Sequence, residues 1–524
     1  MIKKFINKLL GKPAPASKHP FGKRMEIGPA EHGIDPKLVD ERAINVVRTL
    51  KHAGFEAYVV GGAVRDLMLG LAPKDFDVAT NATPEQVKGL FRRAFIIGRR
   101  FRIVHVVYGR GREHEVIEVS TFRAFLDNAA AEQVAGNEKT SKSELAGMTH
   151  AVDSTGRVLR DNVWGPQDED ATRRDFTINA MYYDPETQTV VDYHHGIKDA
   201  KAKVIRMIGD PVARYREDPV RIIRAIRFAA KLNGLGFTLE PKTATPLVKS
   251  KALLLEVPQS RMFDEMLKLL QTGHALASIA QLKALGMASG IYPLLDVVVE
   301  RADTPFVASA LQDTDRRVAE GKPVAPSFLL ACVLWAEVRD GWAARLKHQP
   351  SHPALQDAIE DVFAARIGDV SGRGKLAGDM REIWMMQPRF EKRVGSAPFG
   401  LVEQPRFRAA FDFMRLRAEN GELDEVLSDW WQEFSLADDN LRNDMVDEVR
   451  LEQQQRTRTV RPPRPPKVVR VQEAANVSDS ADAPSTDTAP VGEAALGDAP
   501  KKRRRRRRPS GGAAADFSPK DPAP

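Results

Sequence analysis

The stretch Gly61-Gly62-Ala63-Val64-Arg65-Asp66, followed shortly by Lys74-Asp75-Phe76-Asp77, decides the fold of the first part of this chain. The apolar run over 55–60 that precedes it predicts a strand ending at the glycine pair. A short helix is expected over 63–69, and a second strand over 75–79. The pattern therefore predicts an α+β unit in which a strand, a glycine turn and a helix lead into another strand.

The two aspartates of this stretch are the candidate catalytic residues. Residues i and i+2 of a strand share a face, so Asp75 and Asp77 are expected to project together while Phe76 enters a core. Neighbouring carboxylates repel each other unless a cation lies between them. Mg²⁺ fits, with Mn²⁺ as the alternative ion, because it is often bound by one or two carboxylates plus substrate phosphates. The bland alternative is an Asp-x-Asp pair on an ordinary loop.

Three further residues extend this candidate site. Gly61 and Gly62 would leave backbone N–H groups free to approach a triphosphate, and Arg65 could add a charged contact. Glu118 is the candidate third metal ligand, because it is an isolated charge in the apolar strand expected over 116–120. A plain turn and an ordinary edge-strand glutamate remain the alternatives.

An arginine-rich second half follows in two patches. The first, over 173–180, places Arg174 beside Asp175 and could bind phosphate or ribose; the alternative is a helix start with Asp175 near its N-terminus. The second is a helix expected from Pro219, along which Arg221, Arg224 and Arg227 recur at every third residue. Asp218 and Arg221 could offer an acceptor and a forked donor to the polar edge of a base. The alternative is an amphipathic helix with a surface salt bridge.

Composition limits the class of protein. The 524 residues suggest two or three structural units, and 42% hydrophobic residues suffice for sizeable cores. Cys332, the single cysteine, allows no intrachain disulfide and is expected in a core. No apolar run approaches the ~18 residues that a membrane span needs, and residues 1–12 lack the features of a signal peptide. A cytoplasmic protein without stable membrane insertion is therefore expected.

Residues 61–66, 75–77, 173–179 and 217–221 together resemble the motif set of the class II tRNA nucleotidyltransferase and bacterial poly(A) polymerase superfamily. Segments 99–106, 406–412 and 429–434 are similar to its bacterial poly(A) polymerase I branch. The resemblance implies an α+β fold with a polymerase-β-like nucleotidyltransferase head, followed by an all-helical neck, body and leg. The expected segments are an N-terminal extension and linker over 1–37, the catalytic head over 38–165, the neck over 166–275, the body over 276–455 and a disordered basic tail over 456–524.

The resemblance also assigns roles to the candidate residues. It implies that Asp75, Asp77 and Glu118 serve the metals and that Gly62 and Arg65 contact the nucleotide. Positions that bind or read the incoming nucleotide would be Arg174, Asp218, Arg221, Arg224 and Arg227. Asp175 matches an acidic position of the active site and is counted with the catalytic residues.

The expected reaction is the template-free addition of AMP from ATP to RNA 3′ ends, with release of pyrophosphate, by a monomer that promotes RNA decay. The nearest alternative is a CCA-adding tRNA nucleotidyltransferase, which shares every motif of the site. The other is a non-catalytic RNA-binding adaptor, against which the intact acid pair argues.

The last 74 residues differ in kind, with 11 prolines and Phe517 as the single aromatic. Such a segment cannot bury enough apolar surface to offset its ordering entropy and is expected to be disordered. Its block of eight cations should attract RNA phosphates without reading sequence, or dock to acidic proteins of the RNA-decay machinery. The block consists of Lys501, Lys502, Arg503, Arg504, Arg505, Arg506, Arg507 and Arg508.

Four other predictions concern local structure. Residues 13–35 are expected to be a linker and 126–150 a mobile loop. Mainly helical structure is expected from about 174 to 453, interrupted by a β-hairpin near 190–193.

Overall fold

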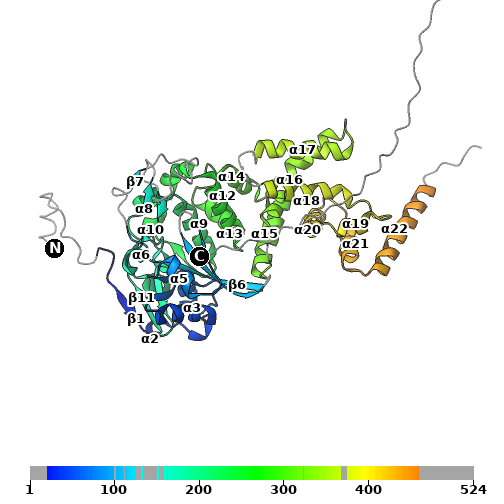
Figure 1. Cartoon of the computed structure of the whole chain (residues 1–524). Helices are drawn as coiled ribbons and strands as arrows, with labels where there is room; N and C mark the ends of the chain where they lie inside the picture. The colour runs from blue at the N-terminus through cyan, green and yellow to red at the C-terminus, as the bar shows by residue number, and fades with distance from the viewer. Residues whose placement is uncertain are drawn as a thin grey trace, which may run out of the picture. The chain divides into compact units, whose positions relative to one another are not determined.

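The computed structural model describes residues 20–459 apart from 99–101, 111–112, 126–131, 134–149, 153–157, 162, 323 and 367–373. The described residues up to Arg458 belong to one compact unit. Its strands lie in the blue-to-green part of the chain, and the green-to-orange part is helical (Figure 1). The expected α+β class with a long helical continuation is confirmed.

An eight-stranded sheet forms the head. The strand order is β1-β11-β10-β2-β3-β6-β5-β4, and all neighbours are antiparallel except the parallel pair β3 and β6. The strands are β1 (Met25–Ile27), β2 (Ala57–Val60), β3 (Asp77–Thr80), β4 (Ala94–Ile97), β5 (Ile103–Arg110), β6 (Glu113–Thr121), β10 (Met181–Asp184) and β11 (Thr189–Asp192).

One face of this sheet is closed by helices. The amphipathic α3 (Glu41–His52) begins at Asp40, whose side chain accepts from the backbone N–H of Arg42. α5 (Pro84–Leu90) begins at Thr83 in a complete capping box, as its sequence predicts. Val46, Val47 and Leu50 of α3 pack with alternate residues of the strands into one core. Burial of this face determines which side chains of each strand enter the core. The alternate side chains therefore lie on the opposite face of the sheet, where the site is.

The predicted limits of the head need correction. Residues 25–27 were expected in a linker, yet they form β1 and pair with β11. α2 (Pro29–His32) follows, so the linker interpretation is wrong for this part of 13–35. The expected hairpin near 190–193 exists as β10 and β11 but is longer, and β10 pairs with β2 of the head sheet. These pairings join segments far apart in sequence, which local patterns do not reveal.

Two small sheets complete the strands. One consists of β7 (Glu132–Gln133), β8 (His150–Val152) and β9 (Val158–Asp161), and the other of β12 (Val204–Ile205) and β13 (Thr238–Leu239). The loop expected over 126–150 therefore contains strand residues where it is described, and its remainder lies outside the described residues.

After β13 the described chain is helical. The mainly helical structure expected from about 174 to 453 is confirmed from α9 onward, apart from the short strand β13. The remaining α-helices are α4 (Gly62–Met68), α6 (Gln167–Arg173), α7 (Gly196–Lys201), α8 (Pro211–Glu217), α9 (Val220–Asn233), α10 (Pro241–Ala244), α11 (Leu247–Ser250), α12 (Gln259–Leu270), α13 (Ala275–Ala284), α14 (Pro293–Arg301), α15 (Pro305–Ala319), α16 (Pro326–Arg345), α17 (Ser351–Arg366), α18 (Gly374–Met386), α19 (Ala397–Val402), α20 (Phe407–Glu419), α21 (Glu425–Leu436) and α22 (Asp439–Thr459).

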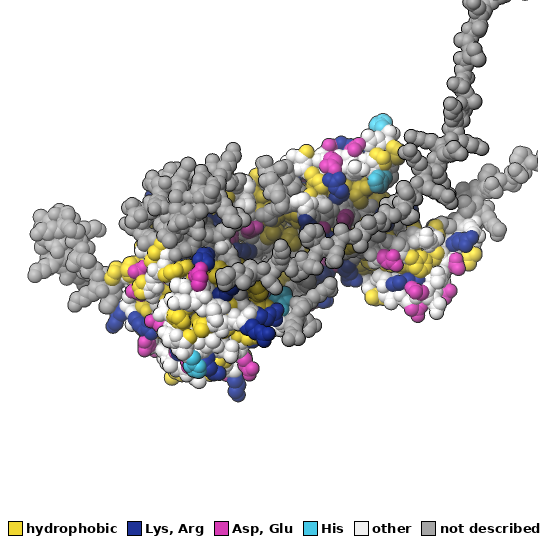
Figure 2. All heavy atoms as spheres, in the orientation of Figure 1, with side chains coloured by type: hydrophobic (Ala, Val, Ile, Leu, Met, Phe, Trp, Pro, Cys, Tyr) yellow, Lys and Arg dark blue, Asp and Glu magenta, His cyan; other side chains and the backbone are white. Residues whose placement is uncertain are grey.

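The helices enclose two apolar cores. The larger runs from α9 through α16 and contains Cys332, which is buried as expected. The smaller joins α20 and α21 around Trp431. Over the described residues, no helix is long and apolar enough to cross a membrane. On the face shown in Figure 2, basic and acidic side chains are interspersed, so positive charge is not gathered into one field there.

Candidate active site

A pocket of about 490 Å³ lies where the open face of the head sheet meets α6, α9 and α12. It is lined by carboxylates from β3, β6 and the α6–α9 region, and by arginines from the same helices. The lining residues are Gly61, Gly62, Asp77, Glu118, Ser120, Thr121, Arg123, Asp170, Arg173, Arg174, Asp175, Asn179, Asp218, Arg221, Arg224, Phe228 and Arg261. Most of the predicted site residues are thus brought together, although they are spread over 160 positions of sequence.

Asp77 and Glu118 form the acidic end of this pocket. They are direct partners in the parallel pairing of β3 with β6, so their side chains project from the same face on adjacent strands. Partial removal from water, together with the charges of Glu118 and Asp75, raises the pKa of Asp77 to about 6, against the opposing effect of Arg174. Crowded carboxylates of this kind favour an added cation, so the residues fit a metal.

Asp75 has a different position from the one predicted. β3 begins at Asp77, so the two aspartates do not share a strand, and the i, i+2 argument is wrong in that detail. Asp75 is exposed just before the strand, while Phe76 is buried as expected. Its charge still acts on Asp77, which places it beside the acidic end of the pocket without lining it.

Glu118 has a partner of its own. One oxygen of its carboxylate lies 3.2 Å from Nε2 of His105, its direct neighbour on β5. Among the described residues, no group of three or more His, Cys, Asp or Glu side chains is arranged to hold a metal ion. Carboxylates supplemented by substrate phosphates are the arrangement usual for Mg²⁺, and the acidic end of the pocket matches it.

Gly61 occupies a position that requires glycine. Its φ is +80°, where side chains are strained, and an added Cβ would lie 3.8 Å from Nη1 of Arg174 and 4.0 Å from Oδ2 of Asp77. The backbone therefore passes between the acidic and basic sides of the pocket, where close approach of a ligand needs an open surface.

Arg65 does not lie where the sequence prediction placed it. It is 1% exposed, and its guanidinium donates to Asp66 and to the side-chain oxygen of Asn179. Among the described residues the pocket lining includes Asn179 but not Arg65. The guanidinium of Arg65 is therefore buried next to Gly62 and does not face the pocket. It contributes indirectly, by holding the side chain of the lining residue Asn179.

Arg174 is fixed at the end of α6. Its Nη2 donates to Asp170 at 3.1 Å and its Nε to the hydroxyl of Tyr182 at 3.2 Å. That hydroxyl in turn donates to Asp170 at 2.7 Å. These contacts leave Nη1 beside Gly61, facing the side of the pocket that Asp77 lines. The helix expected directly after this patch is absent from the described chain here, since a 3₁₀ turn (Thr177–Asn179) and β10 follow.

Asp175 connects the head to α9. It accepts from Nε of Arg221 at 2.8 Å and pairs with Nη2 of Arg224 at 2.9 Å. Burial acts to raise the pKa of Asp175, but Arg224 and Arg221 outweigh it and the pKa lies below its ordinary value. Arg221 also pairs with Glu217 at 3.0 Å. Asp175 is therefore an ionised anchor that orients two lining arginines.

Asp218 has a partner on α12 that its own stretch of sequence does not reveal. Nη1 and Nη2 of Arg261 on α12 donate to its two carboxylate oxygens at 2.7 and 2.8 Å. The expected side-by-side pair with Arg221 is thus only part of the arrangement, because both aspartate oxygens are held from another helix. The sequence carried no signal for this contact, since the partners are 43 residues apart.

Arg227, Arg123 and Arg173 complete the basic surroundings. Arg227 lies over the ring of Phe228 at 4.9 Å and is not in the described lining, whereas Arg224 and Phe228 are. Burial lowers the pKa of Arg123 to about 10 and that of Arg173 to about 9, and repulsion adds to both shifts, from Arg174 on Arg123 and from Arg123 on Arg173. Concentrated positive charge of this kind is relieved by a bound anion.

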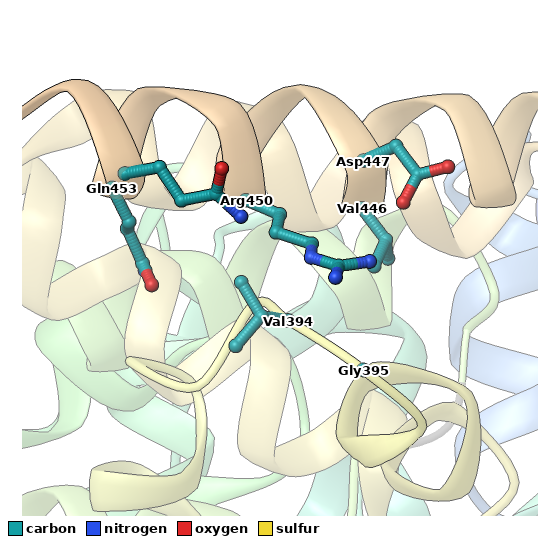
Figure 3. A pocket seen from close by; sticks show the side chains of 7 residues that line it. Val394, Gly395, Val446, Asp447, Arg450 and Gln453 are labelled. Atoms are coloured by element: carbon teal, nitrogen blue, oxygen red, sulfur yellow. The ribbon is translucent and has the colours of Figure 1, made fainter.

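A second pocket, of about 420 Å³, lies between residues 394–395 and α22 (Figure 3). Gln453 extends from the helix toward the loop that carries Val394, and Arg450 runs along the helix toward Val446. Asp447 is its one lining acid. It has no paired carboxylates among its lining residues and is not a candidate for the same chemistry.

Comparison with known proteins decides the family. A model described as "Poly A polymerase head domain" matches residues 57–206, "Probable RNA and SrmB- binding site of polymerase A" matches 236–298, and "Polymerase A arginine-rich C-terminus" matches 347–465. Poly(A) polymerase I of Haemophilus influenzae is 40% identical over 432 residues, which cover 80% of this chain and 90% of the relative. This chain belongs to the bacterial poly(A) polymerase I family. Its members are nucleotidyltransferases that add adenylate to RNA.

Coverage separates this family from the alternative. Poly(A) polymerase I of Escherichia coli O6:H1 is 40% identical over 442 residues, covering 82% of this chain and 90% of the relative. The CCA-adding enzyme of Bacillus subtilis is 35% identical over 268 residues, covering 51% of this chain and 59% of the relative. The match to the poly(A) polymerase I relatives thus covers about four fifths of this chain, against about half for the CCA-adding enzyme, and the model of the polymerase A C-terminus matches the helical body over 347–465.

Some predicted features lie outside the described residues. These are the cationic block from Lys501 to Arg508 and residues 99–101 of the family-like segment 99–106. The segments 406–412 and 429–434 are described and lie in or beside α20 and α21, where Phe411, Trp431 and Phe434 form core.

Proposed function

We propose that the pocket binds ATP with its triphosphate between Asp77 and the arginines, and that AMP passes from it to an RNA 3′-hydroxyl. The observation that carries this proposal is the opposition of an acidic pair and a group of partly buried arginines across one pocket. Attack of the hydroxyl on the α-phosphorus forms the new phosphodiester bond, and the bond to pyrophosphate breaks. No covalent enzyme intermediate is required.

Asp77 and Asp75 are the residues that would hold Mg²⁺, with Glu118 as a neighbour of Asp77 on the adjacent strand. Bound there, the metal supplies Lewis-acid activation of the attacking hydroxyl and neutralises phosphate charge. Arg123, Arg173 and Arg174 compensate the triphosphate's charge from the opposite side. Burial lowers the pKa of Arg123 and of Arg173, so a bound anion would favour the charged forms of both side chains.

Asp218, Arg221 and Arg224 supply the groups that select the base. They project from the start of α9 with fixed directions, because Arg261 holds Asp218 and because Asp175 holds both arginines. Nε of Arg224 is buried without a hydrogen-bond partner among the described residues, so this lining arginine retains donor capacity. Asp175 is a positioning residue in this scheme, and Arg65 supports Asn179 in the same way.

The wider role proposed for the enzyme is the tailing of RNAs for decay by a cytoplasmic monomer. The cations of 501–508 would hold RNA through its phosphates or dock acidic decay proteins. This part rests on composition and on the family.

The deciding experiment supplies each nucleoside triphosphate separately, with Mg²⁺, to a generic RNA and to a tRNA lacking its CCA end. Long products made with ATP alone support the proposal. Incorporation of CMP from CTP into the tRNA would favour the CCA-adding alternative. Asp77→Ala should abolish incorporation while the thermal unfolding profile stays cooperative. RNA binding without pyrophosphate release by the wild-type protein would indicate an adaptor instead.

A further inference from the structure

The open face of the head sheet continues beyond the acidic pair to the sheet edge. Across the strands, Asp77 pairs with Glu118, Glu118 with His105, and His105 with Phe95 of the edge strand β4. Paired residues share a face, so these four side chains form one row that starts in the active site. With about 4.8 Å between strands, Phe95 lies about 14 Å from Asp77.

Apolar side chains flank this row and remain at least partly exposed. Phe95 is 56% exposed. Ile97, Ile103, Val107 and Val116, which point to the same face by the strand pairing, are all half-buried. The other half of this face, from β3 to β11, is closed by buried Phe122 and Tyr182. A solvent-facing side of an antiparallel sheet is normally polar, so an apolar surface here needs another explanation.

We propose that this surface, the Phe95–His105 platform, receives the unpaired bases of the RNA 3′ end. The inference rests on the proposed function, in which ATP occupies the pocket and the RNA 3′ end must approach Asp77 from outside it. A flat aromatic and aliphatic surface suits nucleobases, which stack on aromatic rings whatever their sequence. The terminal base would lie near His105 and the preceding base on Phe95, with the 3′-hydroxyl directed along the row toward Asp77.

The platform also predicts which RNA ends are used. A base inside a helix is stacked and paired and cannot lie flat on the sheet, whereas an unpaired end can. An RNA with two or more unpaired 3′ nucleotides should therefore be a better substrate than a blunt hairpin of the same length. The half-exposed His105 contributes its ring face while its Nε2 remains with Glu118.

The test uses the full-length protein with Phe95→Ala, Phe95→Leu and Phe95→Tyr. Loss of one stacked base predicts a KM for single-stranded RNA raised about 5- to 20-fold in Phe95→Ala, at the lower end of stacking contributions because the ring is at an edge. The KM for ATP should stay within about twofold. Phe95→Tyr keeps the ring and should match wild type, whereas Phe95→Leu keeps only apolar bulk and should resemble Phe95→Ala.

A double-mutant cycle makes the result specific. An abasic penultimate nucleotide should weaken wild-type binding but add little to the Phe95→Ala defect, since both changes remove the same contact. Leu436→Ala, which changes a side chain 75% exposed on α21, is the matched surface control and should alter neither KM. An unchanged RNA KM in Phe95→Ala, or additive effects in the cycle, would overturn the platform. Absence of AMP transfer by wild type would instead overturn the proposed function.

Discussion

Replacement of Arg261 by lysine tests whether a long-range ion pair sets nucleotide selection. Lysine keeps the charge but cannot donate to both oxygens of Asp218 at once. Loss of one of the two charge-assisted bonds, at 2.7 and 2.8 Å, costs about 1–1.5 kcal/mol. That corresponds to a fall of about 5- to 13-fold in kcat/KM for ATP. The kcat/KM for CTP should fall less, so the ratio of the ATP value to the CTP value should decrease.

Arg261→Ala should have the larger effect. Breaking a buried pair costs about 3–5 kcal/mol, but Arg261 keeps 24% of its side chain exposed, so about 2–3 kcal/mol is expected. Steady-state incorporation from ATP and from CTP on a short oligo(A) primer measures kcat/KM for each nucleotide. The matched control is Arg406→Lys, which alters a similar pair with Asp379 in the helical body. Equal ATP preference in wild type and Arg261→Lys would refute the idea that Arg261 orients Asp218.

Three further predictions concern the acidic end and its supports. The raised pKa of Asp77, about 6 against 3.8, means that the folded protein binds this proton more tightly than the unfolded chain does. Without metal, Asp77 therefore contributes added stability as pH falls from 7 toward 4, and thermal unfolding of Asp77→Asn should lack that pH-dependent component. Gly61→Ala should lower the free energy of unfolding by about 1–2 kcal/mol and should also lower kcat. The control Gly70→Ala, at φ +71° with open space around it, should lower the free energy of unfolding alone. Thermal unfolding and steady-state kinetics measure the two effects. Tyr182→Phe removes a buried hydroxyl that contacts both Asp170 and Arg174, so we expect the free energy of unfolding to fall by about 1–3 kcal/mol. The KM for ATP should rise, because Arg174 loses one of the contacts that fix it. An unchanged KM would mean that Arg174 does not bind the phosphates.

The sequence allowed the local parts of the site to be predicted. Glycines before a helix, a carboxylate at the start of β3 and arginines along α9 all follow from short patterns, and each was placed to within two residues. The family resemblance then supplied roles that spacing alone left open. Local signals are strong here because turn, cap and amphipathic periodicity act over only a few residues.

Long-range pairings were not predictable in the same way. β1 was taken for part of a linker because three residues carry no periodicity of their own, and only β11 makes them a strand. Arg65 was expected in the pocket, but its burial depends on Asn179, 114 residues away. Arg261 went unnoticed because nothing near it in sequence reveals Asp218. Each case depends on a partner that only the folded chain brings close.

The contacts around Arg214 and Arg221 have a consequence for repeated addition. Nη2 of Arg214 donates to the carbonyls of Arg173 and Arg174 at 2.7 and 2.8 Å, and Nη1 of Arg221 donates to the carbonyl of Arg214 at 3.0 Å. Together these hydrogen bonds tie the start of α9, for which we propose base selection, to residues 173–174 at the end of α6. Translocation after each adenylate should therefore be a movement of the RNA by one nucleotide, with the walls of the pocket remaining in place.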